Sequence, residues 1–259
     1  MSAGAPSPAR RVLITGAGRG IGRTTAVLLA AAGARVVGVS RTASELQSLA
    51  DESPVEVTAC SVADAAGCRE VAQEAVRRLG GVDALVHCAG VDTHRERPIW
   101  DQDETVWEQT MRVNGWAPYE LTRLLSGGMV DRGWGRIVVV ASTAGIAGGP
   151  ECTAYCAAKH AAVGMVRAAA LDLAPHGVTC NAVLPGWVRG TAMSDVTMQM
   201  TAERDGITVG EAWERIEQAT PAGRVATPAE VAAAIAFLVS DDAGAITGET
   251  VRVAHGSPW

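Results

Sequence analysis

Short apolar segments alternate with alanine-rich segments along most of the 259-residue chain, and this alternation restricts the fold more than any other feature. The apolar segments are rich in β-branched residues, which is typical of strands buried on both faces of a sheet. The expected strands are Arg11–Thr15, Arg35–Val39, Val55–Cys60, Asp83–His87, Ile137–Ala141, Thr179–Val183 and Thr250–Val253. The expected helices are Gly22–Ala32, Asp64–Leu79, Met111–Arg132, Thr153–Ala174 and Pro228–Val239. Repeated strand–helix units predict an α/β fold with a parallel, doubly wound sheet.

The segment Trp187–Pro221 departs from this alternation. It is rich in Met, Thr and Trp, weakly periodic, and long for a plain connection, which is typical of a lid or binding loop. No linker, repeat or low-complexity block interrupts the rest, so we expect one domain over residues 11–259, with 187–221 as a substrate lid. Residues 1–10 lack the apolar core of a signal peptide and are expected to form a short disordered tail.

Charge and composition argue against several classes of function. The net charge is −6 and no stripe of Lys and Arg concentrates positive charge, so a nucleic-acid partner is not expected. No uncharged apolar run approaches the roughly 18 residues of a membrane span, so no membrane partner is expected. The six cysteines fall mostly in apolar segments and are interpreted as reduced residues of a cytoplasmic protein. Cys152-x3-Cys156 suggests a metal site, but no second pair of ligand spacing supports one, so no metal is expected.

A glycine-rich stretch, Thr15–Gly22 (TGAGRGIG), directly follows the first expected strand. Glycine lets the backbone approach a pyrophosphate closely, and the helix that follows offers unpaired N–H groups and a positive dipole end. The spacing is G-x3-G-x-G rather than G-x-G-x-x-G, but the strand-to-helix junction is the context that a dinucleotide site requires.

Tyr155 and Lys159 lie four residues apart on an expected helix, so both side chains can reach one pocket. A phenol loses its proton near pH 10, and a neighbouring positive charge lowers that pKa, so the pair is interpreted as a tuned acid and base. The alternative, a solvated lysine beside a packed tyrosine, is at least as common for this spacing alone. Ser142 precedes Tyr155 by thirteen residues, and Tyr119 is the only other tyrosine.

Together with Asn114, these stretches resemble the short-chain dehydrogenase/reductase family, in particular its members similar to 3-oxoacyl-carrier-protein reductases and ketoreductases. The resemblance runs from Arg11 to about Gly256 and includes Cys88-Ala89-Gly90 and Pro185-Gly186. It implies a single Rossmann-type domain, with about seven strands and helices on both faces, that binds a nicotinamide dinucleotide. The implied chemistry is hydride transfer between the nicotinamide and a carbonyl or secondary alcohol carbon.

The resemblance also implies a role for each catalytic residue. Tyr155 would exchange a proton with the substrate oxygen, and Lys159 would lower the pKa of Tyr155 and bind the nicotinamide ribose. Ser142 would hold the substrate oxygen, and Asn114 would help to retain a water that relays protons. The structural alternatives are a strand-end turn for Ser142 and a helix cap or kink for Asn114.

The expected cofactor contacts include several positions that depart from the family pattern. The full set is Gly16, Gly18, Arg19, Gly20, Ile21, Ser40, Arg41, Ser61, Val62, Cys88, Ala89, Gly90, Tyr155, Lys159, Pro185, Gly186, Val188 and Thr191. Ser61 replaces an Asp that commonly accepts a hydrogen bond from adenine, and the stretch before Thr191 is one residue longer than usual. His87 replaces an Asn and is interpreted as a core histidine with a hydrogen-bond partner. Ala254 and His255 stand where Asp and Gly are common, which weakens inference about subunit contacts near that end.

Charge at the second expected strand favours NADP(H) over NAD(H). NAD enzymes usually place an acid there to bind the ribose 2′-hydroxyl, whereas this chain has Ser40 and Arg41, with no acid before Glu45. Arg19 could lie on the same side of the ribose, and two guanidinium groups suit a phosphate dianion. The alternative is that Arg41 caps a turn and faces solvent.

The substrate pocket is expected to be lined by Thr143–Cys152, Trp187, Met193, Met198, Met200 and Trp213. Met and Trp make an adaptable apolar surface, which favours a hydrophobic ketone or secondary alcohol. The alternative is that these residues only pack the lid onto the domain. Arg189 could meet a carboxylate or a phosphopantetheine phosphate, although a lone loop arginine is more often solvated.

Two other functions stay open from the sequence. One is a dehydratase or epimerase of the same fold that uses a bound dinucleotide without net turnover, and the other is a non-catalytic dinucleotide-binding sensor or scaffold. The family resemblance also implies a homo-oligomer, either a dimer or a tetramer, built on Met111–Arg132 and Thr153–Ala174.

Overall fold

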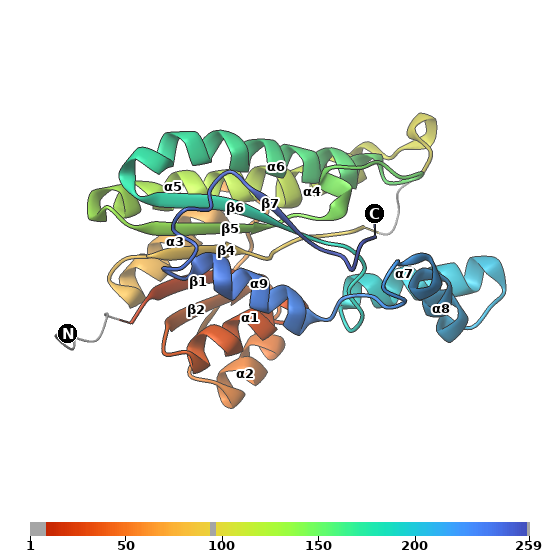
Figure 1. Ribbon diagram of the computed structural model, residues 1–259, viewed down its shortest axis with the longest axis horizontal. Helices are drawn as coiled ribbons and strands as arrows, with labels where there is room; N and C mark the ends of the chain where they lie inside the picture. The colour runs from red at the N-terminus through yellow and green to blue at the C-terminus, as the bar shows by residue number, and fades with distance from the viewer. Residues whose placement is uncertain (1–8, 94–96, 258–259) are drawn as a thin grey trace.

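Seven parallel strands form a sheet through the middle of the molecule (Figure 1). The structure is a computed structural model that describes residues 9–93 and 97–257, so the tail expected at 1–10 lies almost wholly outside the described residues. The strands are β1 Arg11–Thr15, β2 Arg35–Ser40, β3 Glu56–Ala59, β4 Ala84–His87, β5 Gly135–Val140, β6 Val178–Pro185 and β7 Thr250–Val253. Their order is β3-β2-β1-β4-β5-β6-β7, and every neighbouring pair is parallel. The predicted strands and the doubly wound sheet are confirmed, with shifts of one or two residues at strand ends.

The α-helices are α1 Gly20–Ala31, α2 Ala43–Glu52, α3 Ala65–Leu79, α4 Glu104–Thr110, α5 Ala117–Arg132, α6 Thr153–Leu173, α7 Ala192–Asp205, α8 Val209–Ala219 and α9 Pro228–Val239. Short 3₁₀ turns lie at Ile99–Asp101, Thr143–Gly145 and Ala174–His176. The sequence analysis missed α2, because only Leu46 and Leu49 of its ten residues are buried, too few to show a period. The single helix expected over Met111–Arg132 is wrong in its first part, since Met111–Trp116 forms a π-helical turn before α5 begins.

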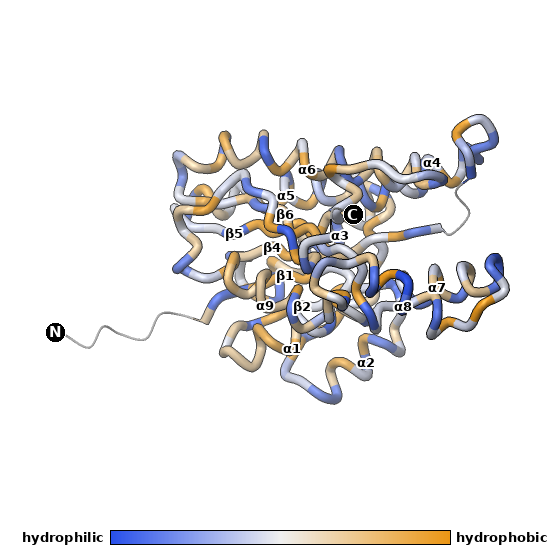
Figure 2. Tube along the Cα trace, turned by 45° about the vertical axis from the view of Figure 1, so that its right-hand side comes forward, coloured by the Kyte–Doolittle hydropathy of each residue, from blue (hydrophilic) through white to orange (hydrophobic). Residues whose placement is uncertain are grey.

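Helices cover both faces of the sheet (Figure 1). Helices α3, α5 and α6 pack on one face, and α1, α2 and α9 pack on the other. Successive strand residues point to opposite faces, so Leu13 joins the first cluster while Val12 and Ile14 join the second. The strands are accordingly the most hydrophobic part of the trace (Figure 2). Because both clusters are closed, the ends of the strands are the part of the sheet left to form a site.

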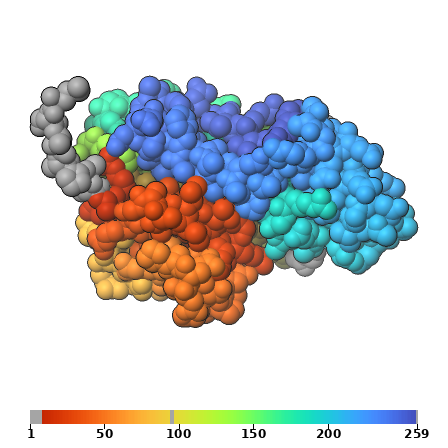
Figure 3. Space-filling model, turned by 60° about the horizontal axis from the view of Figure 1, so that its bottom comes forward, coloured from red at the N-terminus to blue at the C-terminus, as the bar shows by residue number. Residues whose placement is uncertain are grey.

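Helices α7 and α8 project beyond the sheet layers as a separate lobe (Figure 3). They form their own small core around Met198 and Trp213, which are 1% and 4% exposed. The segment 187–221 therefore contains two helices that the sequence analysis did not predict, and its role as a lid stays a prediction. Thr208 and Glu211 form a complete capping box at the start of α8, with Glu211 Oε2 accepting from the Thr208 N–H at 2.8 Å. This Thr-x-x-Glu motif was the available sequence signal for that helix.

Within the described parts of the chain, none of the helices is both long and apolar enough to cross a membrane.

The turn between β1 and α1 closes on itself so tightly that Gly22 has no room for a side chain. A Cβ at this position would lie 2.2 Å from the carbonyl oxygen of Gly16. We predict that Gly22→Ala lowers the unfolding free energy by about 2 kcal/mol, typical of an overpacked site, and the melting temperature by roughly 5 °C. Differential scanning calorimetry measures both.

The matched control is Gly127→Ala on α5, where nothing lies within 4 Å of an added Cβ. Alanine in an open helix position is expected to raise stability by about 0.5–1 kcal/mol relative to glycine. Equal melting temperatures for Gly22→Ala and Gly127→Ala would contradict the assigned role of the turn.

Candidate active site

The candidate site lies at the carboxyl ends of the strands, where the sheet reverses its winding direction. Strand β1 has β2 on one side and β4 on the other, so the loops that follow β1 and β4 separate and leave a crevice between them. One pocket fills this crevice, and all the residues expected to contact the cofactor line it. The sequence prediction of these residues did not include several neighbours that also line the pocket, among them Thr42, Glu45, Val91 and Val113.

Thr15 and Gly16 join the loop after β1 to the loop after β4. The Thr15 hydroxyl accepts a hydrogen bond from the Ala89 N–H at 3.2 Å and lies 3.0 Å from Nδ1 of His87. Gly16 has a φ of +70°, and a Cβ there would lie 2.7 Å from the Ala89 nitrogen. These contacts leave the glycine backbone facing the pocket. His87 is a core histidine with a hydrogen-bond partner, as predicted, and burial lowers its pKa to about 3, so it is neutral.

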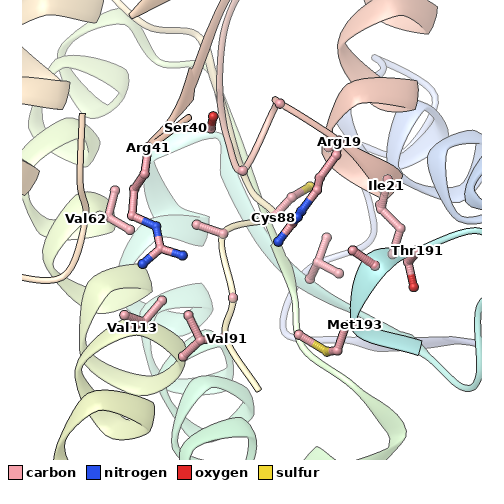
Figure 4. A pocket seen from close by; sticks show the side chains of 18 of the residues that line it. Arg19, Ile21, Ser40, Arg41, Val62, Cys88, Val91, Val113, Thr191 and Met193 are labelled. Carbon is pink, nitrogen blue, oxygen red and sulfur yellow. The ribbon is translucent and has the colours of Figure 1, made fainter. Parts of the chain in front are cut away.

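Arg19 and Arg41 extend into this pocket from its two sides (Figure 4). Both side chains are exposed, and Arg19 lies 3.5 Å from Glu45 in a loose ion pair. Glu45 lies beside Gly18 and Ser40, since its Oε2 and the Ser40 hydroxyl would each lie 2.7 Å from a Cβ placed on Gly18. The structure therefore adds an acid to the cluster that the sequence analysis treated as wholly basic.

Thr191 begins α7, and its position connects the projecting lobe to the glycine turn. Its hydroxyl donates to the carbonyl of Val188 at 3.0 Å, and its methyl carbon would lie 3.4 Å from a Cβ on Gly20. The longer stretch before Thr191 therefore still brings this residue to the pocket wall. Ser61 also lines the pocket, and its hydroxyl accepts a hydrogen bond from the Ala63 N–H at 3.2 Å.

Tyr155 and Ser142 meet at the inner end of the pocket. Ser142 follows β5 and caps the turn at Thr143–Gly145 by accepting from the Ala144 N–H at 3.1 Å, as a strand-end turn residue does. Tyr155 lies in the first turn of α6, and its hydroxyl is hydrogen-bonded to Ser142 and lies 3.8 Å from the Met193 sulfur. Burial raises the pKa of Tyr155, and the bond to Ser142 only partly offsets this. The phenol is therefore protonated at neutral pH.

Lys159 lies one turn further along α6 and is 5% exposed. Its Nζ donates to the carbonyl of Val140 at 3.0 Å and lies 5.6 Å from the centre of the Tyr155 ring. Burial lowers the pKa of Lys159 to about 8. The pKa of Tyr155 is thus raised overall and not lowered as predicted, because burial is the largest influence on this phenol and outweighs the effect of a nearby positive charge.

Asn114 lies in the π-helical turn, a feature that is frequent at functional sites. Its side-chain amide binds the backbone of Val91 twice, with Oδ1 accepting from N–H at 2.9 Å and Nδ2 donating to C=O at 2.7 Å. Asn114 thus ties the helix to the loop after β4 and lies beside Gly90, with Oδ1 3.2 Å from a Cβ placed there. Lys159 Nζ would lie 3.7 Å from the same Cβ, so Asn114 and Lys159 both lie beside Gly90, while the role of Asn114 in retaining a water stays a prediction.

A second cavity of 540 Å³ opens next to the first, a volume within the usual range for small-molecule sites. Trp187, Met193 and Met200 line it, together with residues of the segment Thr143–Cys152. Met198 and Trp213 do not, because they form the core of the lobe, so for these two the expected pocket role is wrong and the packing alternative is correct. Arg189 also points elsewhere, pairing with Glu217 at 2.9 Å. Asp92 and Arg204 line the cavity and were not predicted.

The two cavities share Ser142, Tyr155, Gly186, Met193 and Ser194. The side chains of Ser142 and Tyr155 therefore lie at the boundary between the two cavities. This arrangement can donate a hydrogen bond and a proton to an oxygen atom held between Ser142 and Tyr155.

Known proteins are similar to this chain in sequence and in architecture. The family model described as enoyl-(acyl carrier protein) reductase matches residues 16–257. The short-chain reductase protein NovJ of Streptomyces niveus is 34% identical over 253 residues, which cover 95% of this chain and 93% of that protein. The 3-oxoacyl-(acyl-carrier-protein) reductase FabG of Vibrio cholerae is 34% identical over 246 residues, covering 94% of this chain and 95% of that protein.

Solved structures agree with the sequence relatives. A crystal structure of an actinorhodin polyketide ketoreductase variant with NADPH matches with a TM-score of 0.91 at 32% identity, covering 96% of this chain and 97% of that one. Levodione reductase matches with a TM-score of 0.89 at 30% identity, covering 95% of this chain and 96% of that one. The chain belongs to the short-chain dehydrogenase/reductase family, among members similar to 3-oxoacyl-carrier-protein reductases and ketoreductases.

Proposed function

We propose that this protein is an NADP(H)-dependent ketoreductase that interconverts a hydrophobic ketone and its secondary alcohol. The observation that carries the proposal is the meeting of two cavities at the Ser142 and Tyr155 hydroxyls. One cavity has the glycine-lined form of a dinucleotide site, and the other has the size of a small-molecule site. Two similar proteins support the same reaction class. One is the 3-oxoacyl-(acyl-carrier-protein) reductase of Vibrio cholerae, and the other is the actinorhodin polyketide ketoreductase solved with NADPH.

The residues of the first cavity fit a nicotinamide dinucleotide. Gly16 and Gly18 leave backbone exposed where any Cβ would collide with neighbouring atoms, and the residue before α1 makes no side-chain capping bond to the helix that starts at this turn. Lys159 would bind the nicotinamide ribose, and Thr191 would bind the carboxamide. The bound cofactor would supply the hydride for reduction or accept it in oxidation.

The protein's own contribution is to hold and protonate the substrate oxygen. Ser142 and Tyr155 donate hydrogen bonds to the carbonyl oxygen, where negative charge develops during reduction. Tyr155 then gives up its proton, which it retains at neutral pH because burial raises its pKa. The nearby charged Lys159 stabilises the phenolate that is left. Asn114 would help to retain a relay water that returns a proton from solvent.

Arg19 and Arg41 support a preference for NADP(H). Both arginine side chains extend into the pocket from its two sides, and two guanidinium groups there can hold a 2′-phosphate (Figure 4). Glu45 competes for Arg19, so the phosphate must displace it. We therefore assign Arg41 the larger share of the selectivity.

The second cavity supports a hydrophobic ketone, since Trp187, Met193 and Met200 provide an apolar wall. We propose that residues 187–221, with α7 and α8, act as the substrate lid, because Thr191 and Met193 from this segment line the cavities.

We also propose a homo-oligomer, a dimer or tetramer, built on α5 and α6. An apolar surface hollow that includes Met111, Tyr119 and Met165 supports it. The cytoplasmic location stays a prediction.

The alternative functions have less support. A sensor or scaffold does not need a protonated tyrosine bound to a serine between two cavities. A dehydratase or epimerase would use the same cofactor pocket without net cofactor oxidation, so turnover of NADPH separates it from a ketoreductase.

We predict that Tyr155→Phe lowers kcat for ketone reduction by about 10²–10⁴-fold, because it removes the proton donor. Binding of NADPH should change little, since the hydroxyl points to the substrate side. The measurement follows NADPH absorbance with a panel of apolar ketones, together with fluorescence titration of NADPH. Tyr119→Phe is the matched control and should keep full activity, because Tyr119 lies on α5 and lines neither of the two cavities that share Tyr155. Tight NADPH binding without oxidation by any ketone would argue against the proposed reaction.

Charge changes at Arg41 and at Glu45 should change the use of NADPH in opposite directions. We predict that Arg41→Asp lowers kcat/KM for NADPH by about 10–100-fold, the value of a charge-assisted hydrogen bond, while the value for NADH changes little. Glu45→Gln should raise affinity for NADPH about 2–5-fold, because it frees Arg19 from a solvent-exposed ion pair. Steady-state kinetics with both cofactors give the ratios. Equal use of NADH and NADPH by the wild type, with no loss in Arg41→Asp, would refute the assignment.

The pKa of Lys159 predicts the pH dependence of reduction. Lys159 is charged below pH 8 and loses its charge as pH rises through about 8, whereas Tyr155 stays protonated throughout. We therefore expect kcat/KM for reduction to fall tenfold per pH unit above this value, since kcat/KM reports ionisations of the unliganded enzyme. In Lys159→Arg the guanidinium does not titrate, so the fall should disappear. A wild-type profile that stays flat to pH 10 would show that this charge is not used.

A further inference from the structure

Two cysteines flank the catalytic tyrosine at the wall of the substrate cavity. Cys152 directly precedes α6 and Cys156 lies in its first turn, and their Sγ atoms are 3.1 Å apart. Both line the 540 Å³ cavity and are half-buried, so small molecules that enter the cavity can reach them. The proposed reduction assigns neither thiol a role.

The backbone between the two cysteines permits a disulfide. Residues i and i+4 of a helix have Cα atoms about 6 Å apart, since the rise is about 1.5 Å per residue. A disulfide accepts Cα separations of about 4.4–6.8 Å. Cys152 is the residue before the helix, with φ −143° and ψ 34°, and its carbonyl accepts a hydrogen bond from the Cys156 N–H at 2.8 Å, which holds the two residues one turn apart. By contrast, Cys68 and Cys180 are fully buried in the core.

The surroundings favour a reactive thiol at Cys152. It lies at the N-terminal end of the 21-residue helix α6, where the helix dipole favours negative charge. Arg204 lines the same cavity together with Asp92 and Glu151, so the helix N-terminus is the positive feature beside this thiol. The Cys152 Sγ now donates to the carbonyl of Gly149 at 3.1 Å, a weak bond that costs little to give up.

We propose that Cys152 and Cys156 form a peroxide-sensitive dithiol whose oxidation to a disulfide inhibits the enzyme. One thiolate attacks hydrogen peroxide, so that an S–O bond forms, the O–O bond breaks, and hydroxide leaves and takes up a proton as water. The second thiol attacks the resulting sulfenic sulfur, so that the S–S bond forms, the S–O bond breaks, and a second water leaves. The two sulfurs together supply the two electrons that reduce the peroxide.

The disulfide would change the turn of helix that positions Tyr155. An S–S bond is about 2.05 Å long, so the sulfurs must approach by about 1 Å from their present 3.1 Å. Tyr155 lies between them in the chain, and its hydroxyl must meet both Ser142 and the substrate. A displacement of about 1 Å at a catalytic group costs on the order of 100-fold in rate. The glycine turn and the arginines of the cofactor pocket lie away from this turn, so NADPH binding should persist.

Mass spectrometry tests the modification itself, independently of any activity. The protein is treated with hydrogen peroxide, remaining thiols are alkylated, and trypsin releases residues 137–159, which contain Cys152 and Cys156 and no other cysteine. We expect this peptide to lose two hydrogens, to escape alkylation, and to recover both thiols after dithiothreitol. Alkylation of both residues after peroxide treatment would overturn the proposal, as would separate oxidation to sulfinic acids.

Activity tests the inhibition, which rests on the proposed ketone reduction. Oxidised wild type should lose at least tenfold in kcat and regain it with dithiothreitol, with the Kd for NADPH unchanged. Cys152→Ser and Cys156→Ser should each abolish this sensitivity, whereas Cys180→Ala keeps the dithiol and should respond like wild type. Inhibition that persists in the serine variants, or that dithiothreitol does not reverse, would assign the damage to another residue such as Met193. If the disulfide forms and no ketone is reduced even by reduced protein, the proposed function fails rather than the dithiol.

Discussion

The close approach of Gly16 to the backbone of Ala89 is the constraint on which the site depends. It exists because β1 and β4 are neighbours in the sheet although β2 and β3 intervene in the sequence. A side chain at Gly16 would separate the two loops, and the Thr15 hydroxyl that bonds Ala89 would lose its partner. The cofactor pocket is therefore a consequence of strand order, with the glycines permitting two backbones to meet where the winding reverses.

Burial then sets the chemistry at the inner end of this crevice. It raises the pKa of Tyr155 and lowers that of Lys159 to about 8, so their proton affinities move in opposite directions from the ordinary values. The result at neutral pH is a neutral phenol beside a cation, which suits proton donation to a carbonyl oxygen. From the Tyr-x3-Lys spacing we inferred that attraction between the two groups sets the pKa of Tyr155. In this geometry, desolvation of both side chains has the larger effect on their pKa values.

The strands, five of the helices and the catalytic motifs could be predicted, because each depends on a hydrophobic pattern or a motif within a short stretch of sequence. The π-helical turn at Met111–Trp116 could not be predicted, since its six residues are too few to show a period of their own. Helix α7 has a weak apolar period, whereas α8 is strongly amphipathic and starts at the Thr208–Glu211 capping box, so α8 could have been predicted from its sequence. Glu45 required the three-dimensional neighbourhood of Gly18 and Ser40, which lies beyond any local pattern.

The meaning of Cys152-x3-Cys156 illustrates the same limit. As a spacing it suggested a metal site that nothing else in the sequence supported, and the residues then had no assigned purpose. The fold places both thiols on the cavity wall, before and after Tyr155 in the chain. What matters is therefore that they lie next to a catalytic residue at the start of the same helix. A bond between them would act on Tyr155 through the backbone of that turn, while the cofactor pocket is held separately by the Gly16–Ala89 contact. The two halves of the site can thus respond differently to one chemical change.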